Sequence, residues 1–296
     1  MAAETLVAII GGTGLGEALG ALGPGEVREL DTPFGRPSGP ITLTEVDGVR
    51  VALLSRHGEG HLLNPTQVPY SANLFALKAL GVTHVLASGA VGSLREEIAP
   101  RDLVVPDQLI DRTTRRAGTF FEELSVHVEL SQPFCPALRR ALLEAGAAGG
   151  GARVHAQGTY VCMEGPALST RAESLMHRAW GADLVGMTAM PEAKLAREAE
   201  LHYALVALPT DYDCWQLPPP GASAQSIVEG VVKNLRAVTA SGLALIRRAL
   251  PRVAALPAGC GCDSALALGI WSDRARTPPE VRRRLAPLLG KYLPAT

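Results

Sequence analysis

Short apolar runs, each long enough for one buried strand, alternate with amphipathic segments through most of this 296-residue chain. This alternation is typical of an α/β fold, in which helices cover a central sheet. The predicted strands are Leu6–Ile10, Ile41–Val46, Val49–Ser55, Val82–Ala87, Asp102–Val105, Gly158–Met163, Asp183–Met187 and Tyr203–Leu208. The Asp47-Gly48 turn signal between the second and third of these predicts a hairpin.

The predicted helices lie between these strands. Thr66–Leu80 is one, and Thr170–Glu173 has capping-box spacing at the start of another that runs to near Trp180. Pro191 suits the first turn of a third helix. Ser226–Glu229 opens a fourth, with apolar residues at 227, 228, 231, 232, 235 and 238. No internal repeat is evident, so residues 1–296 are expected to form one domain, with 256–296 as a tail packed on its core.

The charge balance argues against several function classes. Lys and Arg total 28 against 29 Asp and Glu, which gives no electrostatic footprint for nucleic acid or an acidic membrane. The first ten residues lack the pattern of a signal peptide, and no apolar run is long enough to span a membrane. Five scattered cysteines do not make a secreted disulfide framework, so a cytoplasmic protein is expected.

Polar and glycine-rich clusters follow directly after several predicted strands. Because ligands of parallel α/β sheets collect at the carboxyl ends of strands, these clusters predict one composite site. Gly11–Gly14 offers backbone N–H groups and the Thr13 hydroxyl to a phosphate. Glu17 breaks the dinucleotide-binding glycine spacing, and no P-loop lysine follows. Arg56-His57 adds a guanidinium that can hold phosphate oxygens.

Other clusters are ambiguous on their own. Ser88–Ser93 is predicted to be a small-residue loop that lets a flat ligand approach the backbone. Asp211 and Asp213 face one side if strand geometry persists, which suits metal ligation, acid–base work on a glycosidic bond, or binding of a base. With no third hard ligand nearby in sequence, metal is disfavoured. Each cluster could also be an ordinary turn or a pair of solvated side chains.

Histidine and cysteine give weaker signals. His61 and His127 could line an apolar pocket, although a lone histidine is usually an ordinary surface or core residue. Cys260-Gly261-Cys262 could bind a metal only with ligands from elsewhere in the chain, and there is no second cysteine pair. A local disulfide or two inert thiols is expected there.

Taken together and in order, the motifs resemble those of a known family. IIGGTGLG, DTPFGRPS, RHGEGH, VGSLREE, PDQLIDRT, QPFCP, EGPALSTRAES, GMTAMPE and TDYDCW follow one another as in 5′-methylthioadenosine phosphorylases, within the trimeric purine nucleoside phosphorylases. The resemblance runs from about Val7 to Trp215 and more loosely to about Leu250. It implies a single α/β domain with a central mixed, barrel-like β-sheet surrounded by helices, assembled as a homotrimer.

The resemblance also implies roles for individual residues. Phosphate would be held by Thr13, Arg56, His57, Gly89, Ala90 and Thr188. Met187 would contact the ribose, and Asp211 and Asp213 would face the purine edge as the catalytic residues. The 5′ pocket would be lined by His61, Ile227 and Val228, with His127 contributed by a neighbouring subunit. Some microbial members of the family also have a Cys-x-Cys near the C-terminus.

The implied reaction is phosphorolysis of 5′-methylthioadenosine, or a related 5′-substituted adenosine, to adenine and a sugar 1-phosphate. Phosphate would be a co-substrate, with no metal and no other cofactor. Two carboxylates favour adenine, because its 6-amino group is a donor that needs an acceptor. The alternatives are a phosphorylase for 6-oxopurine nucleosides such as inosine, guanosine or methylthioinosine, and a nucleoside-binding protein without activity.

The chain departs from the family pattern at two places. Ala167-Leu168 follows Glu164-Gly165-Pro166 where the family usually has Arg-Phe, so Leu168 takes the place of the aromatic side chain that would stack on the base. Gly89 stands where a Ser, Thr or Asn is usual, which removes one polar contact to phosphate.

Overall fold

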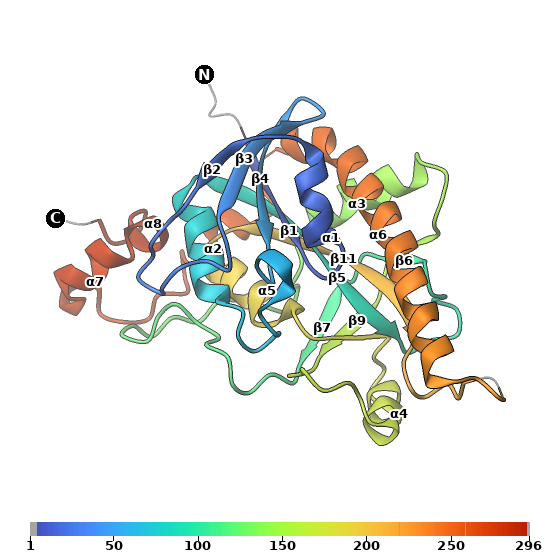
Figure 1. The fold of residues 1–296 in the computed structure, drawn as a ribbon. Coiled ribbons are helices and arrows are strands. Elements are labelled where there is room, and N and C mark those ends of the chain that lie inside the picture. The colour runs from blue at the N-terminus through green and yellow to red at the C-terminus, as the bar shows by residue number, and fades with distance from the viewer. Residues whose placement is uncertain (1–4, 219, 258, 295–296) are drawn as a thin grey trace.

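A central sheet with helices on both of its faces forms the body of the protein in this computed structural model, which describes residues 5–218, 220–257 and 259–294 (Figure 1). The strands are β1 (Leu6–Gly11), β2 (Glu26–Arg28), β3 (Ile41–Val46), β4 (Val49–Ser55), β5 (Val82–Ser93), β6 (Leu103–Val104), β7 (Gln108–Asp111), β8 (Val154–His155), β9 (Thr159–Cys162), β10 (Leu184–Gly186) and β11 (His202–Tyr212). The α-helices are α1 (Leu15–Ala18), α2 (Tyr70–Ala79), α3 (Pro136–Ala147), α4 (Arg171–Ala179), α5 (Ala189–Glu198), α6 (Ala224–Ala254), α7 (Pro279–Arg284) and α8 (Ala286–Leu289).

The eleven strands form one mixed sheet, as expected. Its main path is β2-β3-β4-β1-β5-β10-β9-β7, and β11 pairs with β5 and β6 while β6 also pairs with β8. β1, β4, β5 and β11 run parallel to their partners at the centre, whereas the predicted hairpin of β3 and β4 is antiparallel. The carboxyl ends of the central parallel strands therefore lie at the same edge of the sheet.

Both faces of the sheet are buried because alternate side chains of each central strand point to opposite sides. In β1, Ala8 and Ile10 pack into a core with α2, α5 and the C-terminal segment, whereas Val7 and Ile9 pack into a core with α3 and α6. Residues after 255 contribute side chains such as Leu266 to the first of these cores. No helix in the described ranges is long and apolar enough to cross a membrane.

β5 extends six residues beyond its predicted end, so the expectation of a loop at Ser88–Ser93 is wrong. Residues Ser88–Ala90 pair in parallel with Val206–Leu208 of β11, and Gly92 and Ser93 pair with β10. The small side chains allow β10 and β11 to pack closely on either side. Glycine and serine locally favour a loop, and the local sequence cannot show that distant strands pair with this segment and extend β5.

Two predicted helix boundaries also shift. The helix predicted at Thr66–Leu80 begins at Tyr70, because Val68 precedes Pro69 and a residue before proline disfavours the helical conformation. The helix predicted at Ser226 begins at Ala224, where the Ser223 side chain caps the Ser226 N–H. The capping box of Thr170 and Glu173 on α4 is confirmed.

Candidate active site

Five strand ends and the first part of α6 surround one cavity of about 380 Å³. It lies where β1, β4, β5, β10 and β11 end. Of the residues singled out from the sequence, it is lined by Thr13, His57, His61, Gly89, Ala90, Leu168, Met187, Thr188, Asp211 and Asp213. Segments as far apart in sequence as Thr13 and Val231 thus contribute to a single concave surface, whose size suits a small molecule.

The acidic side of the cavity consists of Asp211, near the end of β11, and Asp213, just beyond it. Asp211 accepts a hydrogen bond from the Thr210 hydroxyl at 2.6 Å. Burial raises the pKa of Asp211, and the charge of Asp213 raises it further, so this carboxyl holds a proton more readily than an exposed aspartate. Asp213 Oδ2 is buried and has no hydrogen-bond partner in the described part of the chain. The pair therefore offers a group that can give a proton beside an unused acceptor.

Other lining groups of the cavity are hydroxyls, backbone and one imidazole. Thr13 follows β1, Thr188 precedes α5, and Gly89 and Ala90 are part of β5. His57 Nδ1 lies 2.8 Å from the Leu63 carbonyl oxygen, which can only accept, so Nδ1 carries the proton. Burial, together with the charge of Arg56, lowers the pKa of His57 to about 4, and the ring is neutral at physiological pH.

Arg56, which precedes His57, is fully buried. Its Nε and Nη2 donate to the two carboxylate oxygens of Glu192 at 2.7 Å each, and Nη1 donates to the Ser88 carbonyl at 2.6 Å. Glu192 also accepts from the Tyr203 hydroxyl at 2.8 Å. The ion pair and these hydrogen bonds therefore join the end of β4 to β5, α5 and β11. Gly89 lies on β5, Thr188 directly precedes α5, and Asp211 lies on β11.

Arg56 also reaches the glycine-rich turn after β1. A side chain at Gly12 would place its Cβ 2.6 Å from Arg56 Nη1 and 2.6 Å from the Ser88 carbonyl oxygen, so only glycine fits there. The hydrogen bonds to Glu192 and Ser88 use three of the five guanidinium N–H groups. Arg56 does not line the 380 Å³ cavity itself.

Several predicted residues lie away from this cavity. Ile227 and Val228 are 41% and 61% exposed and do not line it, whereas Val231, one turn further along α6, does. His127 packs against Trp271, with ring centroids 4.5 Å apart, and is outside the cavity of its own chain. Gly11, Gly12 and Gly14 line a second cavity of about 720 Å³, which shares His57 and His61 with the first.

Sequence reasoning missed other members of the site. Met163, Ser169, Val185, Thr210 and Val231 also line the cavity, and Glu192 holds Arg56 from behind. The apolar spacing of α6 included Val231, but the spacing did not show which turn faces the sheet. Glu192 follows the Pro191 turn and carries no local sign that its partner is Arg56, which lies 136 residues away.

We expect that adding a hydroxyl at Gly89 strengthens binding of an oxyanion in this cavity. A Cβ at Gly89 would lie 3.5 Å from Thr188 Oγ1, an ordinary contact, so serine fits without displacement. A hydrogen bond to a charged group contributes about 1.5–3 kcal/mol, so Gly89→Ser should lower the Kd for inorganic phosphate at least about tenfold. Titration of phosphate into the wild type and the variant measures this difference.

Gly12→Ala is the matched contrast, because its Cβ would collide with Arg56 and the backbone of Ser88. It should weaken phosphate binding. Equal phosphate affinity in the wild type and both variants would contradict the expectation that the turn after β1 and Gly89 of β5 contribute to a phosphate site.

The chain has close relatives of known name. The phosphorylase superfamily matches residues 6–250. S-methyl-5′-thioadenosine phosphorylase from Geobacter sulfurreducens is 45% identical over 98% of this chain and 100% of the relative. The enzyme of the same name from Chloroflexus aurantiacus is 46% identical over 97% of this chain and 98% of the relative.

Solved structures agree with this similarity. A methylthioadenosine phosphorylase from an antarctic soil metagenomic library has a TM-score of 0.86 and 42% identity, covering 97% of this chain and 99% of the other. A mutant adenosine/methylthioadenosine phosphorylase from Schistosoma mansoni, in complex with methylthioadenosine, has a TM-score of 0.78 and 36% identity, covering 90% and 97%. The expected mixed α/β fold is confirmed by these matches.

Proposed function

The chain belongs to the phosphorylase superfamily, and on that premise we propose that it cleaves 5′-methylthioadenosine with inorganic phosphate, releasing adenine and the sugar 1-phosphate. Identity of 45% over nearly the whole length of a relative of this activity carries the proposal. The cavity supports it, because hydroxyls, backbone groups and two carboxyls line the same concave surface.

The chemistry follows from the types of residue that line the cavity. The bond between C1′ and the purine N9 breaks as a phosphate oxygen bonds to C1′, and the electron pair of the broken bond goes to the purine. Positive charge that develops on the sugar is stabilised by the phosphate anion beneath it. The negative charge on the leaving purine is removed by a proton delivered to N7. The reaction needs no covalent enzyme intermediate.

We assign delivery of that proton to Asp211. Its burial beside Asp213 favours the protonated form, which is the form a general acid needs. Asp213 then accepts from the 6-amino group through Oδ2, which has no partner among the described residues. The 6-oxo group of hypoxanthine is itself an acceptor and cannot donate a hydrogen bond to Asp213 Oδ2. Asp211 and Asp213 therefore favour adenine over hypoxanthine.

The phosphate lies, in this proposal, between Thr13 and Thr188, with the backbone of Gly89 and Ala90 beside it. Neutral His57 offers Nε2 as an acceptor to a protonated phosphate oxygen. The buried guanidinium of Arg56 supplies positive charge next to the phosphate, and two of its N–H groups lie outside the hydrogen bonds to Glu192 and Ser88. The ion pair with Glu192 keeps that charge in place.

Met187, His61, Leu168 and Val231 leave a mainly apolar region for the ribose and the 5′ methylthio group. Leu168 is 82% exposed and Val228 is 61% exposed in the single chain, which supports covering of the cavity mouth by another copy. We therefore propose a homotrimer in which His127 of a neighbouring copy and the exposed turn of α6 with Ile227 and Val228 complete the 5′ pocket. The cytoplasmic location stays a prediction.

The proposed function is tested by assaying adenine release from 5′-methylthioadenosine with and without phosphate. Release should require phosphate, and inosine should be cleaved at least about 10²-fold less efficiently, because its base leaves buried acceptors unpaired. Preferential turnover of inosine would instead indicate a 6-oxopurine nucleoside phosphorylase. Nucleoside binding by calorimetry without cleavage would indicate a binding protein.

A further inference from the structure

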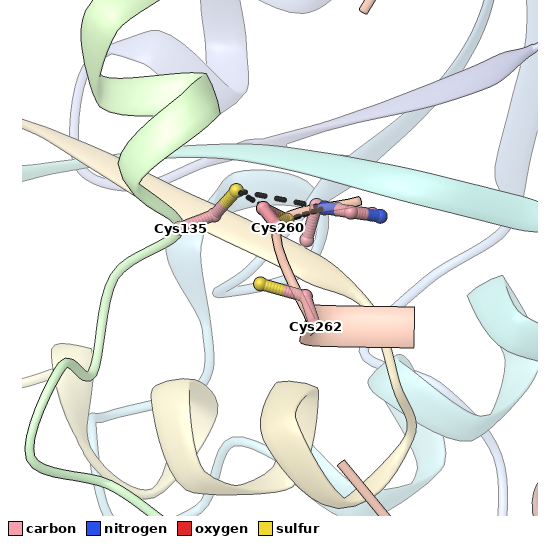
Figure 2. A group of neighbouring side chains, drawn as sticks. Cys135, Cys260 and Cys262 are labelled. Atoms are coloured by element: carbon pink, nitrogen blue, oxygen red, sulfur yellow. Dashed lines mark hydrogen bonds between the residues drawn. The ribbon is translucent and has the colours of Figure 1, made fainter. Parts of the chain in front are cut away.

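Four potential metal ligands meet at the end of β11 that is remote from the cavity. Cys135 immediately precedes α3, His202 is the first residue of β11, and Cys260 and Cys262 belong to the C-terminal segment. Their ligand atoms all lie within 4.8 Å of one another. Figure 2 shows the three cysteine side chains, from α3 and the C-terminal segment, gathered beside the sheet.

Three of the separations are close to the edges of a small tetrahedron. Cys135 Sγ lies 3.6 Å from Cys260 Sγ and 3.5 Å from His202 Nδ1, and Cys260 Sγ lies 3.0 Å from the same nitrogen. Tetrahedral zinc with bonds of about 2.3 Å to sulfur and about 2.0–2.1 Å to nitrogen has edges of roughly 3.8 Å between sulfurs and roughly 3.5 Å between sulfur and nitrogen. These three separations lie within about half an ångström of those edges, and the separations to Cys262 Sγ are at most 4.8 Å, so a metal at the centre needs shifts of no more than about 1 Å.

These distances do not describe a disulfide. Sulfurs in a disulfide are about 2.05 Å apart, and all five cysteines of the chain are unbonded. The local disulfide that the Cys-x-Cys spacing suggested is therefore not what this structure contains. Gly261 has φ 81°, a left-handed conformation, and it turns the chain between the two cysteines.

The surroundings restrict and shield the four side chains. Cys135, His202 and Cys262 are buried, and Cys260 is half-buried. The His202 ring stacks on His84 with centroids 4.4 Å apart, which holds its orientation, and the Cys135 N–H donates to the Tyr203 carbonyl at 2.8 Å. The N-terminus of α3 beside Cys135 favours the negative charge of a thiolate.

We propose that Cys135, His202, Cys260 and Cys262 bind one zinc ion that fastens the C-terminal segment to the core. Three thiolates and one imidazole are a ligand set for structural zinc, because they fill all four positions and leave none for a substrate. His202 and Asp211 lie nine positions apart (202 to 211) on β11, roughly 30 Å in an extended strand, so this site is separate from phosphorolysis.

Other contacts also hold the C-terminal segment, the chain after residue 255, against the core, and the metal would add to them. Glu200 lies just before His202 in sequence. Its carboxylate accepts hydrogen bonds from the Leu266 N–H at 3.0 Å and from the Tyr292 hydroxyl at 2.6 Å. Leu266, Leu285 and Leu289 pack into the core. A metal at Cys260 and Cys262 would fix the start of the segment, upstream of these contacts.

Metal content tests the proposal directly. The protein, expressed with zinc and purified under reducing conditions without chelator, should contain about one zinc ion per chain by elemental analysis. Cobalt(II) added to metal-free protein should give the visible absorption of tetrahedral Co²⁺ and a thiolate-to-cobalt charge-transfer band. Octahedral cobalt spectra, or protein with no zinc and either free thiols or a disulfide at these cysteines, would overturn it.

Variants separate a specific site from incidental thiol binding. Cys262→Ser should lose the zinc and the tetrahedral cobalt spectrum, whereas Cys214→Ser, at a cysteine outside the cluster, should keep both. Chelation of the wild type should lower Tm by roughly 5 °C and expose the chain after residue 255 to protease, with no such shift in Cys262→Ser. Equal zinc content in both variants would refute the assignment, and the cobalt spectrum of the wild type decides it if Cys262→Ser does not fold.

Discussion

Replacing Asp211 with asparagine is expected to lower kcat for 5′-methylthioadenosine by about 10²- to 10⁴-fold, the usual contribution of a general acid. Asparagine keeps the acceptor for the Thr210 hydroxyl, so the local structure should survive. What it loses is the transferable proton. The measurement is kcat at saturating phosphate for the wild type, Asp211→Asn and Asp31→Asn, an exposed aspartate that serves as the control.

The pH profile separates this role from a structural one. A general acid must be protonated, so wild-type kcat should fall as pH rises through the pKa of Asp211, which burial raises above its usual value. Asp211→Asn should lack this alkaline limb. A variant with near-normal kcat, or one with low kcat and an unchanged profile, would remove Asp211 as the proton donor.

Replacing Glu192 with glutamine is expected to destabilise the fold by about 3–5 kcal/mol, because it leaves the Arg56 charge buried without a counter-charge. Glutamine has nearly the same shape, so the loss is electrostatic rather than a cavity. Urea unfolding at fixed protein concentration measures the change. Asp31→Asn, which breaks a solvent-exposed pair with Arg36, should leave the unfolding midpoint unchanged.

A double variant, Arg56→Met with Glu192→Leu, tests the cause of this effect. Replacing both charges by apolar side chains removes the unpaired charge and should recover part of the stability lost in Glu192→Gln, although phosphorolysis should stay impaired. If Glu192→Gln unfolds at the wild-type urea concentration, the ion pair does not hold together the elements that form the cavity.

Local sequence patterns correctly predicted the elements that depend on residues close together in sequence. Asp47-Gly48 predicts the hairpin of β3 and β4, and Thr170 with Glu173 predicts the start of α4, because each signal acts over a few residues. The order of the polar clusters, with the family resemblance, indicated which residues would meet. Ten of the predicted site residues do line one cavity.

Features created by distant pairing could not be predicted in this way. The extension of β5 depends on β11, and the burial of Arg56 depends on Glu192, a partner 136 residues away. Cys260 meets Cys135 across 125 residues and His202 across 58, so the Cys-x-Cys motif alone did not reveal its further ligands. The rotation of α6 likewise decides that Val231, and not Val228, lines the cavity.

The strand ends are proposed to form one site in which Thr13 and Thr188 bind phosphate while Asp211 and Asp213 contact the purine. A crystal structure of the protein with adenine and phosphate tests this most directly. Phosphate oxygens should lie within hydrogen-bond distance of Thr13 and Thr188, and the adenine edge should contact Asp211 and Asp213. Phosphate bound outside this cavity, or adenine with neither carboxyl beside it, would contradict the account.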